Sequence, residues 1–221
     1  ARYHDPADDA LCQVALAPCS PFSVSGELMA AVAALAAERG ALLHTHLGET
    51  EDENAFCLEH YGKRPVDVLE EAGWLRPGTW LAHGIHFSDE EIARLGAAHV
   101  AVSHCPSSNL FLGSGLCPVL DIEAAGCPVG LGVDGSASND HSNLMEEVRQ
   151  ALLVQRLRYG SAAVAATDAL RWATGGGAAL LERPALGRLE EGALADLALF
   201  DPAEDLRFSG AGGLIAARAT S

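Results

Sequence analysis

Short apolar runs alternate along the chain with longer segments in which apolar residues recur every three or four positions. The short runs have the length of buried strands, and the longer segments have the period of amphipathic helices. No two runs are joined by a tight hairpin turn, so we expect parallel strands linked by right-handed helical crossovers. The predicted strands cover 13–18, 41–47, 79–83, 100–104 and 129–134, and the predicted helices cover 27–39, 50–73 with a break at 62–65, 88–95, 119–125, 142–159 and 161–173.

Two of these helices carry an apolar stripe that we expect to be buried. The stripes are Leu28, Val32 and Leu35 in the first helix, and Leu144, Val148, Leu152 and Leu153 in the helix over 142–159. Residues 105–109 are expected to form a loop. The composition changes beyond the last helix, where 187–192 predicts a turn and 193–201 a strand of a different layer. We therefore expect a β/α unit over 1–184 and part of a small β domain over 185–221.

Residues able to bind a metal stand at the ends of four successive predicted strands: His46, His83, His104 and Asp134. Because the carboxyl ends of parallel strands meet at one rim, we expect these side chains to lie close together. Imidazole and carboxylate are the ligands of a catalytic zinc or iron site that leaves one position open for water. A lone histidine pair on a buried strand can instead satisfy backbone carbonyls, but recurrence at four strand ends favours the metal site.

Two polar residues follow the strand-end histidines. Glu49 stands just past His46, where a carboxyl group could carry a proton, and Asn109 follows His104 in the predicted loop. Glu49 also precedes a capping box that begins at Thr50, so a purely structural role at the start of the next helix is the alternative. Alternation along a strand puts His44 on the same face as His46. We expect His44 and the remaining histidines to be structural or exposed.

Charge and cysteine usage exclude several classes of partner. The formal net charge of -16 argues against nucleic acid and anionic membranes, which bind surfaces rich in Lys and Arg, and favours a small neutral or cationic ligand. The six cysteines form no Cys-X-X-Cys pair and no zinc-finger spacing, so we expect reduced thiols and a cytoplasmic protein. The apolar runs are too short to span a membrane, and no signal peptide is expected at the N-terminus.

Four segments together resemble the amidohydrolase superfamily, in the branch of guanine, atrazine-derivative and S-adenosylhomocysteine deaminases. They are HLGET at 46–50, LAHG at 81–84, SHCPSSN at 103–109 and GVDGSASN at 132–139. Three further segments look closest to 8-oxoguanine deaminases: ENAFCL at 53–58, RPVD at 64–67 and EVRQALL at 147–153. The resemblance extends from about residue 11 to residue 201.

The resemblance implies a (β/α)8 barrel of the TIM type that binds one zinc ion per chain, or iron in its place. His46 would be a metal ligand, and Asp134 would be both ligand and base. Glu49 would carry a proton to a ring nitrogen, and His83 would orient the attacking hydroxide. The implied reaction is the hydrolytic deamination of a purine-type base, best represented by 8-oxoguanine, which would give urate and ammonia. The residues expected to contact this substrate are Glu49, His83, His104 and Asn109.

The sequence departs from that family in one respect. The family places a His-X-His metal pair on the first barrel strand, and no such strand precedes residue 12. The match begins near the fourth barrel strand, so we expect this chain to be part of a longer protein and to bind metal weakly on its own. Three alternatives stay open: a hydroxyatrazine-type aminohydrolase, a guanine or isocytosine deaminase, and a catalytically inactive half-barrel that needs a partner chain. The expected partner is a small nucleobase-like molecule, and a homo-oligomer is compatible with the sequence.

Overall fold

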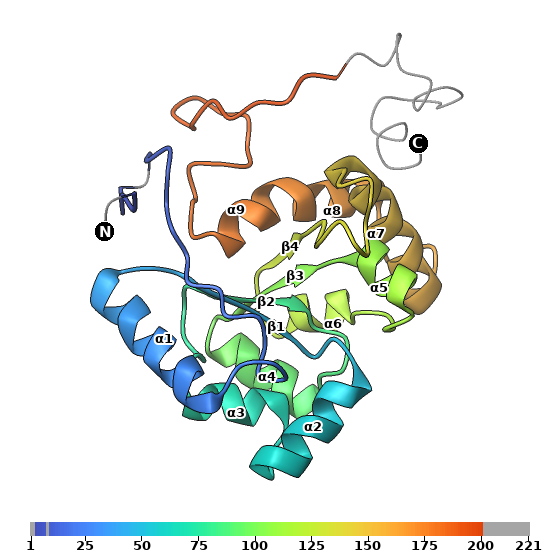
Figure 1. Cartoon of the computed structure of the whole chain (residues 1–221). Coiled ribbons are helices and arrows are strands. Elements are labelled where there is room, and N and C mark those ends of the chain that lie inside the picture. The colour runs from blue at the N-terminus through green and yellow to red at the C-terminus, as the bar shows by residue number, and fades with distance from the viewer. Residues whose placement is uncertain (1–2, 8, 201–221) are drawn as a thin grey trace.

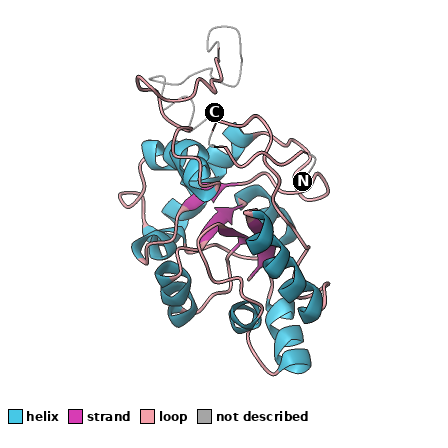
Figure 2. Ribbon diagram, turned by 90° about the vertical axis from the view of Figure 1, so that its left-hand side faces the viewer, coloured by secondary structure: helices cyan, strands magenta, loops and turns pink. Residues whose placement is uncertain are grey.

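A computed structural model describes residues 3–7 and 9–200. Four parallel strands form one sheet in the order β1-β2-β3-β4, so each strand pairs with the next strand along the chain. The strands lie at the centre with helices packed around them (Figures 1 and 2). The predicted parallel α/β architecture is therefore confirmed. The strands are β1 (Leu43–Leu47), β2 (Thr79–His83), β3 (Ala101–His104) and β4 (Val129–Leu131).

Helices connect the strands, as the alternating pattern predicts. Before β2 the chain forms α1 (Gly26–Arg39), α2 (Glu51–Tyr61) and α3 (Pro65–Glu71). Between β2 and β4 it forms α4 (Asp89–Ala97), α5 (Pro106–Leu112) and α6 (Val119–Ala124). After β4 it forms α7 (Leu144–Tyr159), α8 (Ala166–Arg171), the π-helix η1 (Trp172–Gly176) and α9 (Gly177–Leu180). Figure 1 shows the later helices, α7 to α9, grouped beside β4.

The predicted capping residues set the helix ends. Ser25 precedes α1, and its hydroxyl accepts a hydrogen bond from a backbone N–H of the first turn. Ser88 and Glu91 form a reciprocal capping box at the start of α4. Between α2 and α3 the chain turns at Gly62, which has a left-handed φ of 67°, and Pro65 opens α3. The predicted break in the helical region 50–73 is therefore confirmed.

The core lies between the strands and the helices that pack against them. The four strands contribute Leu47, Leu81, Val102 and Val129, all buried. Burial of each such side chain contributes about 1.5–3 kcal/mol relative to exposure. Trp74 joins this core, and its indole N–H donates to the backbone carbonyl of Met29 at 3.0 Å. The large aromatic ring is thus buried without leaving its polar group unpaired.

The predicted strand at 13–18 does not form a regular strand. Leu16 makes a single parallel bridge to the first residue of β1. Pro18 follows, and it has no N–H group with which to extend a ladder. Beyond the proline, the carbonyl of Cys19 accepts a hydrogen bond from the backbone N–H of His46 at 2.9 Å. The segment therefore still runs along β1 and reaches the carboxyl end of that strand.

Two helical segments differ from the prediction. Residues 105–109 are mostly helical, because Pro106 occupies the first position of α5, where the missing N–H has no cost. The predicted helix at 161–173 begins later, with α8, and continues into η1 and α9. Gly176 in η1 lies against β4, where a Cβ atom would come within 2.1 Å of the Val129 carbonyl oxygen. This close approach requires glycine, and the π-helix brings that glycine to the sheet.

The buried faces of α1 and α7 are shifted from the predicted stripes. Val148 and Leu152 are buried as predicted, but Leu28, Leu35, Leu144 and Leu153 are each 40–51% exposed. Helix α1 instead buries Met29, Ala33 and Ala36, while Val32 is partly buried. Helix α7 buries two polar side chains, Glu147 and Gln155. In α7, apolar spacing alone misplaces the buried face because Glu147 and Gln155, which have hydrogen-bond partners, occupy part of it.

The chain beyond α9 contains turns but no strand within the described residues. Gly187 and Gly192 have left-handed φ values of 74° and 89°, which confirms the predicted turn. The strand predicted over 193–201 is not formed at 193–200, and Asp201 lies outside the described residues. The assignment of 185–221 to a small β domain stays a prediction.

The cysteines and the helices of the structure bear on two expectations drawn from the sequence, reduced thiols and apolar runs too short to span a membrane. All six cysteines are free thiols. Cys57, Cys105, Cys117 and Cys127 are buried, and burial raises the pKa of each of these four thiols. In the part of the chain that the structure describes, no helix combines the length and the apolar character needed to cross a membrane.

Candidate metal centre

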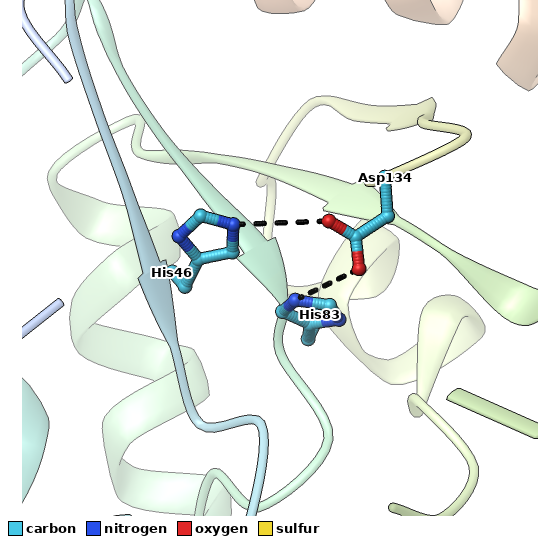
Figure 3. A group of neighbouring side chains, drawn as sticks. All are labelled: His46, His83 and Asp134. Carbon is cyan, nitrogen blue, oxygen red and sulfur yellow. Dashed lines mark ion pairs between the residues drawn. The ribbon is translucent and has the colours of Figure 1, made fainter. Parts of the chain in front are cut away.

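Three side chains with metal-binding atoms meet at the carboxyl ends of the strands (Figure 3). His46 lies in β1, His83 ends β2, and Asp134 follows β4. Nε2 of His46 is 3.9 Å from Oδ1 of Asp134, and Nε2 of His83 is 3.8 Å from Oδ2 of the same carboxylate. One candidate ligand atom from each residue lies within 4.8 Å of the other two. The structure thus brings together three of the four predicted strand-end residues.

Hydrogen bonds on the far side of each imidazole determine which nitrogen faces the centre. Nδ1 of His46 lies 2.7 Å from the carbonyl oxygen of Cys19, and Nδ1 of His83 lies 2.8 Å from Oδ1 of Asn109. Because these oxygens accept, both Nδ1 atoms carry a proton and both Nε2 atoms face Asp134. Nε2 of His83 is buried and has no hydrogen-bond partner among the described residues. A buried nitrogen left unpaired beside a carboxylate is suited to bind a cation.

Strand alternation alone does not bring His83 to the centre. Ala82 pairs with His46 in the sheet and shares its face, so a regular strand would point His83 to the opposite face. His83 instead has a left-handed backbone, with φ 73°, and Gly84 continues the turn with φ 60°. The bend turns the His83 side chain toward the centre. Asp134 is also left-handed, with φ 61°, a conformation that costs an L-residue about 1–2 kcal/mol.

His104 occupies the equivalent strand-end position but lies outside the centre. Ser103 pairs with Ala82, so His104 stands in the register of His83, yet it lacks a left-handed turn. Its side chain is buried against α7, with Nε2 3.4 Å from Nε2 of Gln155. Burial lowers the pKa of His104 to about 3, so its ring is neutral. The prediction that all four strand-end residues meet at one rim is therefore wrong for His104.

Hydroxyl groups hold the carboxylate of Asp134. Ser108 donates its hydroxyl proton to Oδ2 of Asp134 at 2.6 Å, and Oγ of Ser138 lies 3.4 Å from the same oxygen. The neighbouring His46 imidazole and the Ser108 hydroxyl hold the pKa of Asp134 well below its ordinary value. The Asp134 carboxylate in turn raises the pKa of His46 to about 9. The Asp134 carboxylate therefore faces a protonated His46, and a metal cation can take the place of that proton.

Glu49 reaches the centre from the loop after β1. Its Oε2 atom lies 3.6 Å from Nε2 of His83. The backbone N–H groups of Glu49 and Gly48 donate to the buried carboxylate of Glu53, at 3.2 and 2.6 Å. The side chain of Thr50 caps α2 by accepting from the backbone N–H of Glu53. Thr50 and Glu53 thus perform the structural functions at this helix start, and the Glu49 carboxylate is left facing the centre.

The donor set fits zinc. Imidazole nitrogen and carboxylate oxygen are common zinc ligands, and catalytic zinc sites combine protein ligands of this kind with an open position. His46 and Asp134 are the predicted ligands, and the unpaired Nε2 of His83 lies within reach of the same point. His44 is not part of this group. Its ring stacks on Trp80 with centroids 4.7 Å apart, and its Nδ1 atom lies 3.2 Å from the Trp80 carbonyl, as expected for a structural histidine.

Several groups that support the centre were not predicted. They are the carbonyl of Cys19, the hydroxyls of Ser108 and Ser138, and the carboxylate of Glu53. A backbone carbonyl leaves no signal in a sequence. The two serines do leave one, because they stand in the segments 103–109 and 132–139 beside residues that bear the chemistry. Short hydroxyl side chains next to a candidate ligand are natural partners for a carboxylate.

The model of the amidohydrolase family matches residues 2–217 of this chain. The chain belongs to the amidohydrolase family. Both the predicted superfamily and the predicted fold class are thereby confirmed, since solved structures of the same superfamily share this fold.

Individual relatives of this amidohydrolase are deaminases and related hydrolases. The 8-oxoguanine deaminase of Pseudomonas aeruginosa is 59% identical over 210 residues, which cover 95% of this chain and 46% of that protein. The hydroxydechloroatrazine ethylaminohydrolase of Pseudomonas sp. (strain ADP) is 42% identical over 203 residues, 90% of this chain and 42% of that protein. The crystal structure of an adenosine deaminase from Xanthomonas campestris with bound zinc matches with a TM-score of 0.89 at 31% identity, over 96% of this chain and 48% of that one. The chain thus spans about half the length of the relatives it matches.

Proposed function

We propose that the full-length protein is a zinc-dependent aminohydrolase that removes an exocyclic amine from a purine-type base. One observation carries the proposal. Nε2 of His83 lies between two carboxylates, 3.6 Å from Glu49 and 3.8 Å from Asp134. Two carboxyl groups, one proposed as the proton donor and the other as the proton acceptor, thus lie close to a single nitrogen at the strand ends. Hydrolysis of a C–N bond at an amidine carbon needs both groups.

His46 and Asp134 would hold one zinc ion per chain. One nitrogen of His83 lies within 4.8 Å of the proposed ligand atom of each. A bound zinc ion supplies Lewis-acid stabilisation and lowers the pKa of a coordinated water to about 7. Iron could take the same nitrogen and oxygen ligands. The Nδ1 atom of His46 donates to the Cys19 carbonyl, which keeps its Nε2 atom turned toward Asp134.

The residues of this chain divide the proton transfers between them. Asp134 accepts a proton from the attacking water, consistent with a pKa held well below its ordinary value, which keeps the carboxylate ionised. Glu49 donates a proton to the ring nitrogen and makes the amine-bearing carbon electrophilic. His83, buried between them, orients the water. As the C–N bond breaks, the proton held by Asp134 passes to the departing amine, which leaves as ammonia. The hydroxyl proton of the tetrahedral intermediate passes to Glu49 as the carbonyl group forms, and this restores both carboxyl groups to their starting states.

For the substrate we propose 8-oxoguanine, with urate and ammonia as products. The relative named 8-oxoguanine deaminase supports this choice through 59% identity over nearly the whole chain. A hydroxyatrazine-type aminohydrolase is a second candidate, supported by the relative that is 42% identical. Guanine and isocytosine present the same amidine carbon and belong in the same test. The acidic composition agrees with a neutral base as ligand.

Ammonia release by the zinc-loaded full-length protein tests the proposal. The panel is 8-oxoguanine, guanine, isocytosine and hydroxyatrazine, with ethylamine release followed for the last. We expect kcat/KM to be highest for 8-oxoguanine. Turnover of hydroxyatrazine without turnover of 8-oxoguanine would overturn the substrate assignment. A protein that binds zinc yet acts on none of the four bases would favour the catalytically inactive alternative.

A further inference from the structure

The first turn of α5 contacts the metal centre through consecutive residues. The hydroxyl of Ser108 donates to Asp134 at 2.6 Å. The next residue, Asn109, accepts through Oδ1 from Nδ1 of His83 at 2.8 Å. Adjacent residues of one helical turn therefore hold two of the three side chains that form the centre. One of these side chains stands at the end of β2 and the other in the loop after β4.

Both side chains are shielded from the space that a substrate could enter. Ser108 is 0% exposed and Asn109 is 2% exposed. Oγ of Ser108 also lies 2.8 Å from Oγ of Ser138, so its surroundings are filled by protein groups. The acceptor oxygen of Asn109 is already used by His83, and its Nδ2 atom is buried without a hydrogen-bond partner among the described residues. The contact through Oδ1 is therefore independent of the substrate contact that the sequence predicts for Asn109.

A buried carboxylate fixes the turn that carries these residues. Glu147 of α7 is fully buried and accepts from the backbone N–H of Ser107 at 3.0 Å. Its other oxygen accepts from Nδ2 of Asn139 at 2.7 Å, and Nδ2 of Asn139 also donates to the carbonyl of Val133 at 2.8 Å. One side chain thus links the start of α5 to the loop on which Asp134 stands. Burial raises the pKa of Glu147, so its place there has a cost that these hydrogen bonds offset.

We propose that Ser108 and Asn109 are positioning residues of the metal centre. Ser108 fixes the carboxylate of Asp134, and Asn109 fixes the imidazole of His83 with its proton on Nδ1. The inference rests on the metal site proposed above. The two contacts fix the side chains before metal binds. Nε2 of His83 presents a lone pair to the centre, and Oδ2 of Asp134 is held so that Oδ1 faces His46.

The inference makes a quantitative forecast for zinc binding. Loss of the outer partner of a ligating side chain weakens metal binding by roughly 10- to 100-fold. In the full-length protein, Ser108→Ala releases the proposed ligand Asp134 and should raise the zinc Kd by that factor. Asn109→Ala releases His83, which orients the water, and should lower kcat at saturating zinc by a similar factor. Asn109→Asp keeps an acceptor oxygen in place, and its kcat should stay within about threefold of the wild-type value. Leu110→Ala, at a half-exposed neighbouring position of α5, controls for general weakening of the helix.

Titration of the metal-free full-length proteins with zinc, in competition with a chelating dye, gives the zinc Kd of the wild type and of each of the four variants. A separate readout does not depend on any variant: ¹⁵N NMR of the histidine side chains in the metal-free wild type should show a proton on Nδ1 of His83. Steady-state kinetics at saturating zinc are the third readout. The KM of Asn109→Ala should stay near the wild-type value.

These measurements separate the inference from the proposed function. An unchanged zinc Kd for Ser108→Ala, or an unchanged kcat for Asn109→Ala, would overturn the positioning role of that residue. A raised KM with unchanged kcat for Asn109→Ala is the signature of a substrate contact and would also overturn its positioning role. If both alanine variants fail to fold, a proton found on Nε2 of His83 in the wild type still refutes the inference, and a proton on Nδ1 supports it. Absence of zinc binding by the wild type would instead refute the proposed metal site. Zinc binding without turnover of any base would refute only the proposed reaction.

Discussion

His46 and Asp134 face each other across the ends of the sheet, with Nε2 of His46 3.9 Å from Oδ1 of Asp134 (Figure 3). Both residues supply proposed zinc ligands. Replacement of either by alanine should therefore lower the zinc content of the full-length protein from about one ion per chain to near zero and abolish turnover. Elemental analysis of the purified variants measures the zinc content directly.

A histidine from the same strand provides the matched control. His44 shares the face of His46 but hydrogen-bonds to the Trp80 carbonyl and stacks on that indole. His44→Ala should lower the melting temperature and leave the zinc content near one per chain. Loss of zinc in the His44 variant, or a wild-type content near two, would mean that the ligand set is misassigned.

Glu49→Gln should retain fold and zinc and lose turnover by roughly a hundredfold or more, the usual scale of general acid–base catalysis. The amide is nearly isosteric with the carboxyl group but cannot shuttle a proton. Turnover, zinc content and melting temperature should all be measured on the same variant. Glu51→Gln, an exposed carboxylate in the first turn of α2, is the control and should keep its turnover. A nearly active but less stable Glu49→Gln would show that the residue only supports the helix start.

The two strand-end histidines should respond in opposite ways to the same substitution. His83→Asn should cost roughly a hundredfold or more in turnover, because His83 faces both proposed proton-transfer groups. His104→Asn should keep turnover within a few fold and lower the melting temperature, because His104 is buried against α7. Parallel kinetics and thermal unfolding of the two variants make the comparison. Equal losses of turnover would show that His104 contributes to catalysis.

His104 should also shape the dependence of stability on pH. Its pKa is about 3 in the folded protein and near 6.5 when unfolded, so below pH 6.5 the unfolded state binds more protons. The neutral ring therefore favours folding above pH 6.5, and this contribution is lost as the pH falls from 6.5 toward 3. Between pH 6.5 and 5.5 the wild type should lose about 1 kcal/mol of stability relative to His104→Asn. Urea unfolding of the wild type and of His104→Asn at the two pH values measures the difference.

The four strands of the sheet, the helix caps and the order of these elements along the chain were predictable because local signals encode them. Ser25, Gly62 and Ser88 act within one helical turn of their own positions, and a single sequence contains that information. The register of the sheet could not be read in the same way. The positions of His83 and His104 look alike in sequence, and only the backbone turn at the end of β2 separates them. The loop predicted at 105–109 was wrong because Pro106 also fits the first position of a helix.

The ionisable residues of the candidate site could be predicted from the sequence. Glu49, His46, His83 and Asp134 were expected near one another, and the structure places them so. The supporting groups escaped prediction because their partners are distant in sequence. Asn109 could be assigned to the site from its motif, but its contact with Nδ1 of His83 depends on how β2 packs beside α5.

The left-handed turn at His83 limits how a centre of this kind can arise. A mutation that places a histidine at the end of a neighbouring strand would leave its ring turned into the protein interior, as the ring of His104 is. Acquisition of a histidine that faces the centre therefore requires two changes, the new side chain and a residue such as Gly84 that lets the backbone turn. Transplanting only the histidines of this centre onto another parallel sheet would fail for the same reason, whereas transplanting the His83–Gly84 pair would carry the geometry with it.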